Sequence, residues 1–188
     1  MKFYIACSLS RYREHRIIRD ALHATGHEIT VDWTTEPPWV EELEHGIGGS
    51  DARTQVAAVR HAGANDTKGV HDADIVIVLV GGGSGRGTHV ELGLAIAYGK
   101  PVILVGTDKD IWGEGGRGSY TCAFYHVANV HHLFKGGVHI PAYIPVILEM
   151  MKELVKPPRR PSRGVNCTCE LPYPASDGCC NNCGRPLR

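Results

Sequence analysis

The chain has 188 residues, of which 43% are hydrophobic and 21% charged, a composition typical of a globular protein and unlike that of disordered or fibrous chains. Its 20 basic and 20 acidic residues leave no net charge, so the composition favours a small-molecule ligand over nucleic acid or an anionic membrane. No apolar stretch approaches the roughly 20 residues that span a bilayer, and a strand pattern begins at the N-terminus, so we expect a cytoplasmic protein without membrane contact.

Short apolar runs and helical patterns alternate along residues 1–155. The apolar runs predict strands at 3–7, 28–33, 74–80 and 102–105, with a shorter fifth strand at 127–130. Amphipathic patterns predict helices at about 11–24, 51–63, 88–98 and 142–155. Strands that alternate with helices in this way indicate an α/β fold, a doubly wound (flavodoxin-like) parallel five-stranded sheet covered on both faces. Ligands of such sheets bind beyond the carboxyl ends of the strands.

The first helical pattern and the loop after the second strand carry further expectations. In the helix, Ile17, Ile18 and Leu22 are expected to face the sheet. The loop spans about 34–50, which is long for a compact domain, so we expect it to serve as a lid or a subunit contact.

The second helical pattern is bounded by polar residues. Asp51 can cap its N-terminus, and we expect the helix to end near Gly63. The polar residues at 65–67 then predict a turn before the third strand.

A glycine-rich segment, 81–87, joins the third strand to the helix that follows. Its glycines let the backbone approach a ligand closely, and Thr88 can cap the helix. Glu91 would then lie in the first helical turn, where the helix dipole favours an ionised carboxylate. The segment lacks the Lys of a phosphate-binding P-loop and the spacing of a dinucleotide-binding loop. A glycine-rich turn without a ligand is the alternative.

The C-terminal region differs in composition from the rest of the chain. Residues 156–166 are rich in proline and basic residues and indicate a linker. Five of the 7 cysteines follow it, in a Cys-x-Cys and a Cys-x-x-Cys-Gly pattern. Four thiolates suit tetrahedral zinc, and so short a segment, 167–188, needs such a ligand to fold. We expect a small structural zinc module, whose ligands are Cys167, Cys169, Cys180 and Cys183, with Cys179 as a spare or substitute ligand. An unstructured, oxidisable tail is the alternative, and contact of the tail with nucleic acid stays open.

Residues spread along positions 2–155 together resemble the nucleoside 2-deoxyribosyltransferase family, which includes the 2′-deoxynucleoside 5′-phosphate N-hydrolases. The resemblance lies in Tyr4, in Asn65-Asp66 followed by Gly69 and Asp74, in the segment 87–93 and in Gly99-Lys100-Pro101. It does not extend to the cysteine-rich tail.

The resemblance implies an enzyme that breaks the bond between a deoxyribose and its base. Such a reaction develops positive charge at C1′, which one carboxylate can capture while a second acidic group manages the proton of the leaving base. By similarity, Glu91 is the nucleophile, Asp66 handles the proton and orients the sugar, and Tyr4 positions Glu91. The resemblance implies no cofactor for catalysis.

Gly85 bears on the acceptor of the sugar. Nucleoside transferases of this family usually carry an acidic residue six positions before the nucleophile, where this chain has Gly85. The sequence therefore favours hydrolysis of a 2′-deoxynucleoside 5′-monophosphate. A base-exchanging transferase and a non-catalytic nucleotide-sensing module are the alternatives.

The expected substrate contacts come from three parts of the chain. Those after the first two strands include Trp33, which can stack on the base or simply pack, and those after the third include Arg86, which like Arg11 can also be a solvated charge. The family implies a homodimer with a shared active site, completed by the segment after the fourth strand. The candidate residues are Cys7, Ser8, Ser10, Arg11, Trp33, Ser84, Gly85, Arg86, Gly87, Ser119 and Thr121.

The zinc module is directly testable. We expect the purified protein to carry about one zinc per chain, and a Cys180→Ser/Cys183→Ser variant to lose it, because four thiolates form the site. Elemental analysis of the two proteins measures the metal. A native preparation that is fully folded and free of metal would contradict the prediction.

Overall fold

The computed structural model describes residues 1–35, 52–81, 85–114, 121–127, 129–134 and 140–154. The chain divides into two compact units, Met1–Leu148 and Glu149–Arg188, and the first contains the whole sheet. Three predicted features lie outside the described residues: most of the loop at 34–50, the linker and the cysteine-rich tail. Asp51, the expected helix cap, lies outside them as well.

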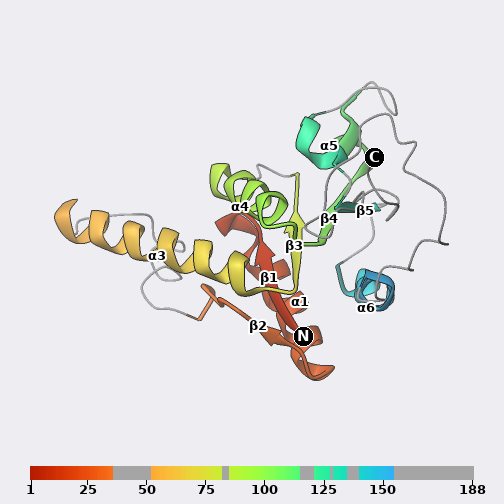
Figure 1. The fold of residues 1–188 in the computed structure, drawn as a ribbon, viewed down its shortest axis with the longest axis horizontal. Coiled ribbons are helices and arrows are strands. Elements are labelled where there is room, and N and C mark those ends of the chain that lie inside the picture. Colours follow the sequence, from red (N-terminus) through yellow and green to blue (C-terminus); the bar gives the residue numbers. More distant parts are fainter. Residues whose placement is uncertain (36–51, 82–84, 115–120, 128, 135–139, 155–188) are drawn as a thin grey trace, which may run out of the picture. The chain divides into compact units, whose positions relative to one another are not determined.

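Five parallel strands form one sheet in the order β2-β1-β3-β4-β5 (Figure 1). From β1 the chain adds β2 on one side of the sheet, and then adds β3 and the later strands on the other side, so the strand order switches direction between β1 and β3. Doubly wound sheets bind ligands at the carboxyl ends of the strands at such a switch point. The predicted α/β fold with a five-stranded parallel sheet is thus confirmed. The strands are β1 (Lys2–Ala6), β2 (Glu28–Ile29), β3 (Ile75–Leu79), β4 (Val102–Gly106) and β5 (Val130–Phe134).

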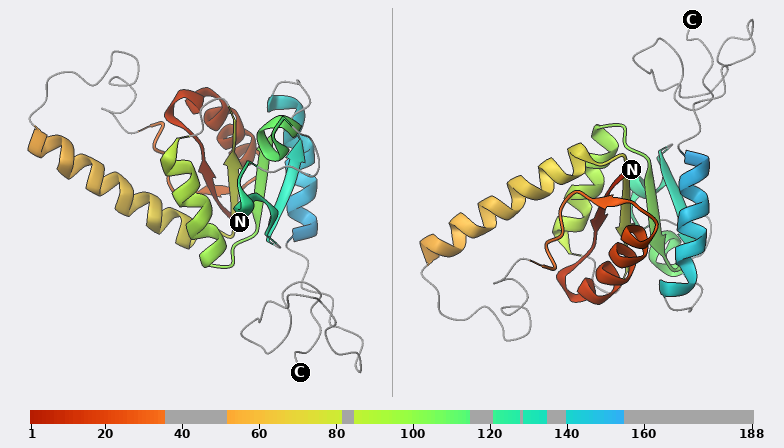
Figure 2. Two further views of the ribbon diagram at one scale, coloured as in Figure 1. Left: turned by 90° about the horizontal axis from the view of Figure 1, so that it is seen from above. Right: turned by 90° about the horizontal axis from the view of Figure 1, so that it is seen from below.

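Helices cover both faces of the sheet. Tyr4 and the other strand residues of one face pack with Val70 and Leu92, which come from α3 and α4. Figure 2 shows α1 on the opposite face from these two helices. The α-helices are α1 (Tyr12–Ala24), α3 (Ala52–Asp72), α4 (Arg86–Ala97), α5 (Asp108–Trp112) and α6 (Ile144–Leu154), and the 3-10 helices are η1 (Leu9–Arg11), η2 (Ala123–His126) and η3 (Ile140–Tyr143).

Helix α3 is longer than the sequence pattern predicts. It continues through Gly63 and through residues 65–67, so the expected turn is wrong. The helix accommodates these polar residues because Thr67 donates its side-chain hydroxyl to the Gly63 carbonyl at 2.8 Å, one turn earlier. As a result, Asp66 is carried by a helix rather than by a turn.

Two expectations about helix faces are also wrong. Ile17 is 36% exposed, and His15 takes the inward position, because the buried face of α1 follows the spacing 15, 18, 22. In α4 the N-cap is Gly85, so Thr88 lies inside the helix as a buried residue and Glu91 falls in the second turn.

The remaining differences concern element ends. The second strand is only Glu28–Ile29, so Trp33 lies in the turn beyond it, and the fifth strand begins at Val130 rather than at 127. Helix α5 was not predicted from the sequence, although Thr107 and Asp110 form a capping box at its start.

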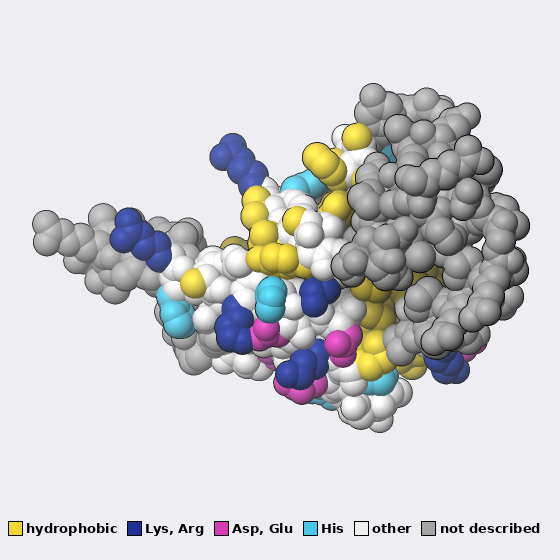
Figure 3. Space-filling model, viewed as in Figure 1, with side chains coloured by type: hydrophobic (Ala, Val, Ile, Leu, Met, Phe, Trp, Pro, Cys, Tyr) yellow, Lys and Arg dark blue, Asp and Glu magenta, His cyan; other side chains and the backbone are white. Residues whose placement is uncertain are grey.

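Basic and acidic side chains lie next to each other on the face shown in Figure 3, and Lys68 pairs with Asp72 one helical turn along α3. The described part of this face therefore presents no large patch of one sign. None of the helices within the described ranges is both long and apolar enough to span a membrane.

Gly81, the first residue after the third strand region, is expected to be essential for stability. Its φ is +90°, and a Cβ there would overlap the carboxyl group of Asp110. We expect Gly81→Ala to lower the free energy of unfolding by roughly 2–4 kcal/mol, measured by urea denaturation. Gly26→Ala is the matched control, because Gly26 has φ +80° but open space around it, and should cost about 1 kcal/mol. Equal losses in the two variants would contradict the role of Asp110.

Candidate active site

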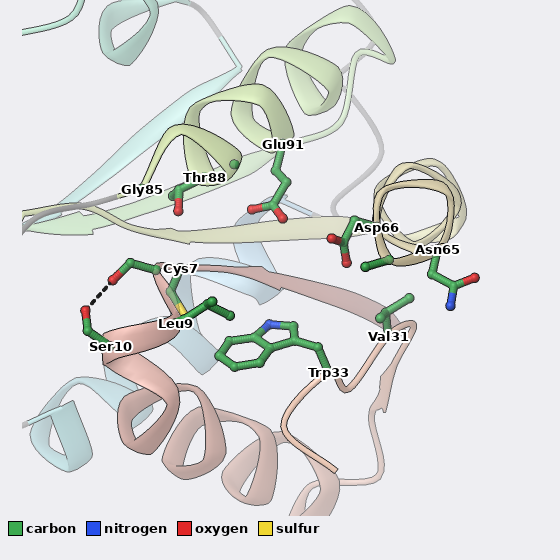
Figure 4. Close-up of a pocket in the computed structure, with 13 residues that line it drawn as sticks. Cys7, Leu9, Ser10, Val31, Trp33, Asn65, Asp66, Gly85, Thr88 and Glu91 are labelled. Carbon is green, nitrogen blue, oxygen red and sulfur yellow. Dashed lines mark hydrogen bonds between the residues drawn. The ribbon is translucent and has the colours of Figure 1, made fainter. Parts of the chain in front are cut away.

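A cavity of about 530 Å³ opens at the carboxyl ends of β1, β2 and β3 (Figure 4). This is the edge of the sheet at which the fold predicts a ligand. Its walls combine apolar side chains with two carboxyl groups, which suits a small organic molecule. The lining residues are Cys7, Ser8, Leu9, Ser10, Val31, Trp33, Ala62, Asn65, Asp66, Gly85, Gly87, Thr88 and Glu91.

Glu91 lies at one side of the cavity and is hydrogen-bonded to Tyr4. The Tyr4 hydroxyl donates to Glu91 Oε1 at 2.8 Å, across 87 residues of sequence. The tyrosine comes from the middle of β1 and is 0% exposed, so its position is determined by the sheet. The second carboxylate oxygen, Oε2, is buried and has no hydrogen-bond partner in the described structure. The protein thus holds Oε1 through Tyr4, whereas Oε2 remains available to contact a ligand in the cavity.

Asp66 faces the same cavity from the neighbouring helix α3 (Figure 4). Its carboxylate interacts with the Tyr4 hydroxyl, both by charge and as a hydrogen-bonding neighbour, and its charge also acts on Glu91. Tyr4 therefore connects two acidic side chains that come from two different helices. The structure therefore places these three residues next to one another.

Burial changes the acidity of all three polar groups at this point of the cavity. Burial above all, and then the charge of Asp66, raises the pKa of Glu91 to about 7, although the Tyr4 hydrogen bond opposes the rise. Burial followed by the charges of Glu91 and Asp66 raises the pKa of Tyr4 above its ordinary value, so Tyr4 stays a phenol and remains a donor. Burial likewise raises the pKa of the Cys7 thiol to about 12, which keeps that lining residue a neutral, unreactive group.

Trp33 forms the wall that faces the two carboxyl groups (Figure 4). Val31 and Ala62 extend this apolar wall, and Leu9 adjoins it. A flat, apolar surface of this kind suits the face of a purine or pyrimidine ring.

The turn that carries Trp33 is tied to α1 on both sides of the indole. Arg19 Nη1 donates to Asp32 Oδ2 at 2.8 Å, and Arg16 Nη2 donates to the Thr34 carbonyl at 2.7 Å. Asp32 also accepts a bond from the Thr34 hydroxyl at 2.6 Å. These contacts hold residues 32–34 in place although they belong to no strand.

His15 supports Trp33 from behind. Its ring lies 5.0 Å from the indole and is completely buried in α1. Burial lowers the pKa of His15 to about 4, so the ring is neutral at physiological pH and acts as a packing surface.

The opposite edge of the cavity is formed by the start of α4 and the segment after β1. Gly85 and Gly87 face Ser8 and Ser10 there, and the two serine hydroxyls are 2.8 Å apart. The free amides at the N-terminus of α4 and these hydroxyls form an edge of hydrogen-bond donors. His89 stabilises it, since its Nδ1 lies 3.3 Å from the Gly85 carbonyl and its Nε2 lies 2.8 Å from the Tyr125 hydroxyl.

The structure brings most, but not all, of the sequence-predicted contacts together. Arg11 is directed away from the cavity, because its guanidinium pairs with Glu14 and donates to the Val80 carbonyl at 2.9 Å. Arg86 is exposed and Thr121 donates to the Asp110 carbonyl at 2.7 Å; neither lines the cavity. Ser84 and Ser119 lie outside the described residues.

Several lining residues were not predicted from the sequence. Thr88 was taken for a helix cap, yet it is 2% exposed, and its hydroxyl has no partner in the described structure. Thr88 precedes Glu91 by three residues, so both lie on one face of a helix, and this spacing could have indicated that Thr88 lines the cavity with Glu91. Asn65 and Ala62 precede Asp66 on α3 by one and four residues, a relation visible only if the helix is continuous there.

Within the described ranges there is no cluster of three or more His, Cys, Asp or Glu side chains able to hold a metal ion. The four expected zinc ligands lie in the tail, outside these ranges.

The sheet topology and the two carboxyl groups at its carboxyl edge define a doubly wound α/β protein with a paired-acid site. A family model described as nucleoside 2-deoxyribosyltransferase matches residues 3–154, and the chain belongs to that family. Members of this family act on nucleosides or nucleotides, and the chain is therefore an enzyme of nucleoside or nucleotide glycosyl transfer or cleavage.

Solved structures similar to the chain include BlsM in solution, with 15% identity and a TM-score of 0.54 over 87% of this chain and 97% of that one. This likeness supports the fold. The CMP N-glycosidase BcmB of Clostridium botulinum is 20% identical over 79% of this chain and 99% of its own, with a TM-score of 0.49. A 2-deoxyribosyltransferase of Bacillus psychrosaccharolyticus is 25% identical over 56% and 72%, with a TM-score of 0.36. None of the curated proteins matches the chain.

The raised pKa of Glu91 has a consequence for stability. Because this pKa lies near 7 rather than at 4.5, the folded state holds the proton more tightly than the unfolded state. Ionisation of Glu91 therefore destabilises the fold; this loss of stability is absent below pH 4.5 and complete above pH 7. We expect Glu91→Gln to be more stable than the parent by about 2 kcal/mol at pH 8, with little gain at pH 4, as measured by urea denaturation. The exposed Glu28→Gln is the control. An equal gain at both pH values would contradict burial of the Glu91 charge.

Proposed function

We propose that the protein hydrolyses the N-glycosidic bond of a 2′-deoxynucleoside 5′-monophosphate and releases the free base. The observation that carries the proposal is the Tyr4–Glu91 hydrogen bond of 2.8 Å beside Asp66, in a cavity with one aromatic wall and one donor-rich edge. These features match the three parts of a nucleotide, with the base on Trp33, the sugar at the carboxyl groups and the phosphate at the start of α4.

The first chemical step forms a bond between Glu91 Oε2 and C1′ while the bond from C1′ to the base nitrogen breaks. In the reactive state Glu91 is ionised and the one proton that the two acids share lies on Asp66, which transfers it to the leaving base, so both products of the cleavage are neutral. Tyr4 keeps its hydrogen bond to Oε1 and so fixes the plane of the attacking carboxylate. The charge that develops on the sugar is opposite to that of ionised Glu91, which lies in a buried site where attraction is strong.

The second step returns the enzyme to its starting state. A water molecule attacks C1′, its proton passes to the Asp66 carboxylate, and the bond to Glu91 breaks. The products are the free base and 2-deoxyribose 5-phosphate, and both acids recover their initial protonation.

The edge at Gly85 supports a nucleotide over a nucleoside. A side chain at this position would point toward Ser8, whose Cβ would lie 3.9 Å away, so an acidic residue there would stand at the donor-rich edge. A carboxylate would repel a phosphate, whereas Gly85 leaves the helix amides and the serine hydroxyls free to bind one. The same absence of an acid favours water over a second base as acceptor.

Other expectations stay predictions alongside this one. They are a cytoplasmic location, a homodimer whose partner subunit completes the site, and a structural zinc in the tail.

The activity test uses the four deoxynucleoside monophosphates and the four matching nucleosides. We expect free base from at least one monophosphate, detected by chromatography, with much slower release from its nucleoside. Glu91→Ala should reduce the rate by at least roughly a thousandfold, because it removes the nucleophile. The reaction needs one proton on the Glu91–Asp66 pair, so kcat/KM of the parent should fall as the pH rises through the Glu91 pKa of about 7 and both acids become ionised. The exposed Glu153→Ala should match the parent enzyme.

The outcomes separate the alternatives. Base exchange with an added free base, without hydrolysis, would identify a transferase. Nucleotide binding without release of base from any of the eight substrates would identify a non-catalytic module.

A further inference from the structure

Gly69 lies in α3 one helical turn after Asp66, where the helix makes a close approach to β1. It is buried, and a Cβ at this position would lie 2.8 Å from Cδ2 and 2.9 Å from Cε2 of Tyr4. It would also lie 2.6 Å from Cγ2 of Val31. Carbon atoms in proteins attract each other at about 3.5–4.0 Å, so no side chain fits here without movement of the helix or of its neighbours.

Tyr4 cannot move to accommodate such a side chain. It is 0% exposed, lies in a strand paired on both sides, and has its hydroxyl held by Glu91. Its ring is the rigid surface against which α3 rests.

The backbone of α3 is fastened to the sheet at the same point. The Thr30 hydroxyl donates to the Gly69 carbonyl at 2.9 Å and reaches the Phe3 carbonyl at 3.2 Å. Phe3 immediately precedes Tyr4, so this hydroxyl joins the helix to the strand that carries the tyrosine.

A glycine inside a helix is less favourable than alanine, so its presence calls for a physical reason. Gly63 lies in the same helix and shows the contrast, because a Cβ there meets nothing within 4 Å. The requirement at Gly69 is therefore local, and it concerns Tyr4 and Val31.

We propose that Gly69 is a positioning residue for catalysis: by lacking a side chain it lets α3 rest directly on the Tyr4 ring and so sets the spacing between Asp66 and the Tyr4–Glu91 pair. This inference rests on the proposed function for its kinetic consequence, but its structural part stands on the contacts alone. In the unsubstituted protein, Asp66 is close enough for its charge to raise the pKa of both Tyr4 and Glu91.

The kinetic test is a double-mutant cycle of Gly69→Ala and Asp66→Asn. We expect Gly69→Ala to lower kcat about 10- to 100-fold with less than about a threefold change in KM, because it displaces the proton donor and leaves the base wall intact. We expect kcat of Gly69→Ala/Asp66→Asn to be no lower than that of Asp66→Asn alone, because displacement of residue 66 has no further effect once its carboxyl group is gone. Gly63→Ala should match the parent enzyme in activity. Additive losses in the cycle would overturn the proposal.

A second variant separates the two contacts of Gly69 and guards against poor folding. Gly69→Ala/Val31→Ala removes the clash with Val31 and keeps the clash with the Tyr4 ring. We expect its kcat to stay low relative to Val31→Ala alone. Full recovery of kcat would show that Gly69 serves the turn at Val31 rather than Tyr4, and would overturn the proposal.

A titration without substrate keeps this inference distinct from the proposed function. We expect NMR of ¹³C-labelled carboxyl groups to show a Glu91 pKa of about 7 in the parent and a lower pKa in Gly69→Ala, because the charge of Asp66 then lies farther away. An unchanged Glu91 pKa in a folded Gly69→Ala protein would overturn the proposal. Failure of the parent to release base would refute the proposed function, and the titration would still decide the role of Gly69.

Discussion

The hydrogen bond from Tyr4 to Glu91 is the interaction on which the site depends. It joins the middle of strand β1 to the second turn of α4, and it places a carboxylate in a largely buried position where its charge is costly. In the described part of the chain, one carboxylate oxygen of Glu91 has no hydrogen-bond partner, and a second acid, Asp66, acts on Glu91 and disfavours its charge further. A carboxylate kept in this condition is poised to react with a positively charged centre.

The two sides of the cavity are built in different ways. The acids stand on α3 and α4, which pack on the sheet and on each other through Val70, Leu92 and their neighbours. The aromatic wall stands on a turn with no strand of its own, and ion pairs and hydrogen bonds from α1 hold it there. The carboxyl groups are thus fixed by apolar packing, whereas the turn that carries Trp33 is held by partly buried polar contacts, with His15 packed behind the indole.

The sequence predicts β3 and β4 well because each is a short, buried run rich in β-branched residues, whereas it gives the wrong bounds for the edge strands β2 and β5. It predicts the site's location because parallel strands end at one edge. It predicts that Tyr4, Asp66 and Glu91 converge only through a family resemblance, since contacts between residues 4 and 91 leave no local pattern. Local sequence patterns give wrong predictions where contacts between distant parts of the chain determine the structure. Polar residues 65–67 resemble a turn but continue α3, and Thr88 resembles a cap but is buried inside α4. The arginine ties around Trp33 and the open space at Gly69 depend on distances between elements, which residue types alone do not encode.

The separate support of Trp33 has a consequence for how this enzyme can diversify. A change in the turn at 32–34, or in the α1 arginines that hold it, alters the apolar wall of the cavity without touching the packed helices that carry the acids. Under the proposed function, preference for one base over another would therefore change through the turn, while the two helices that carry the acids stay unchanged.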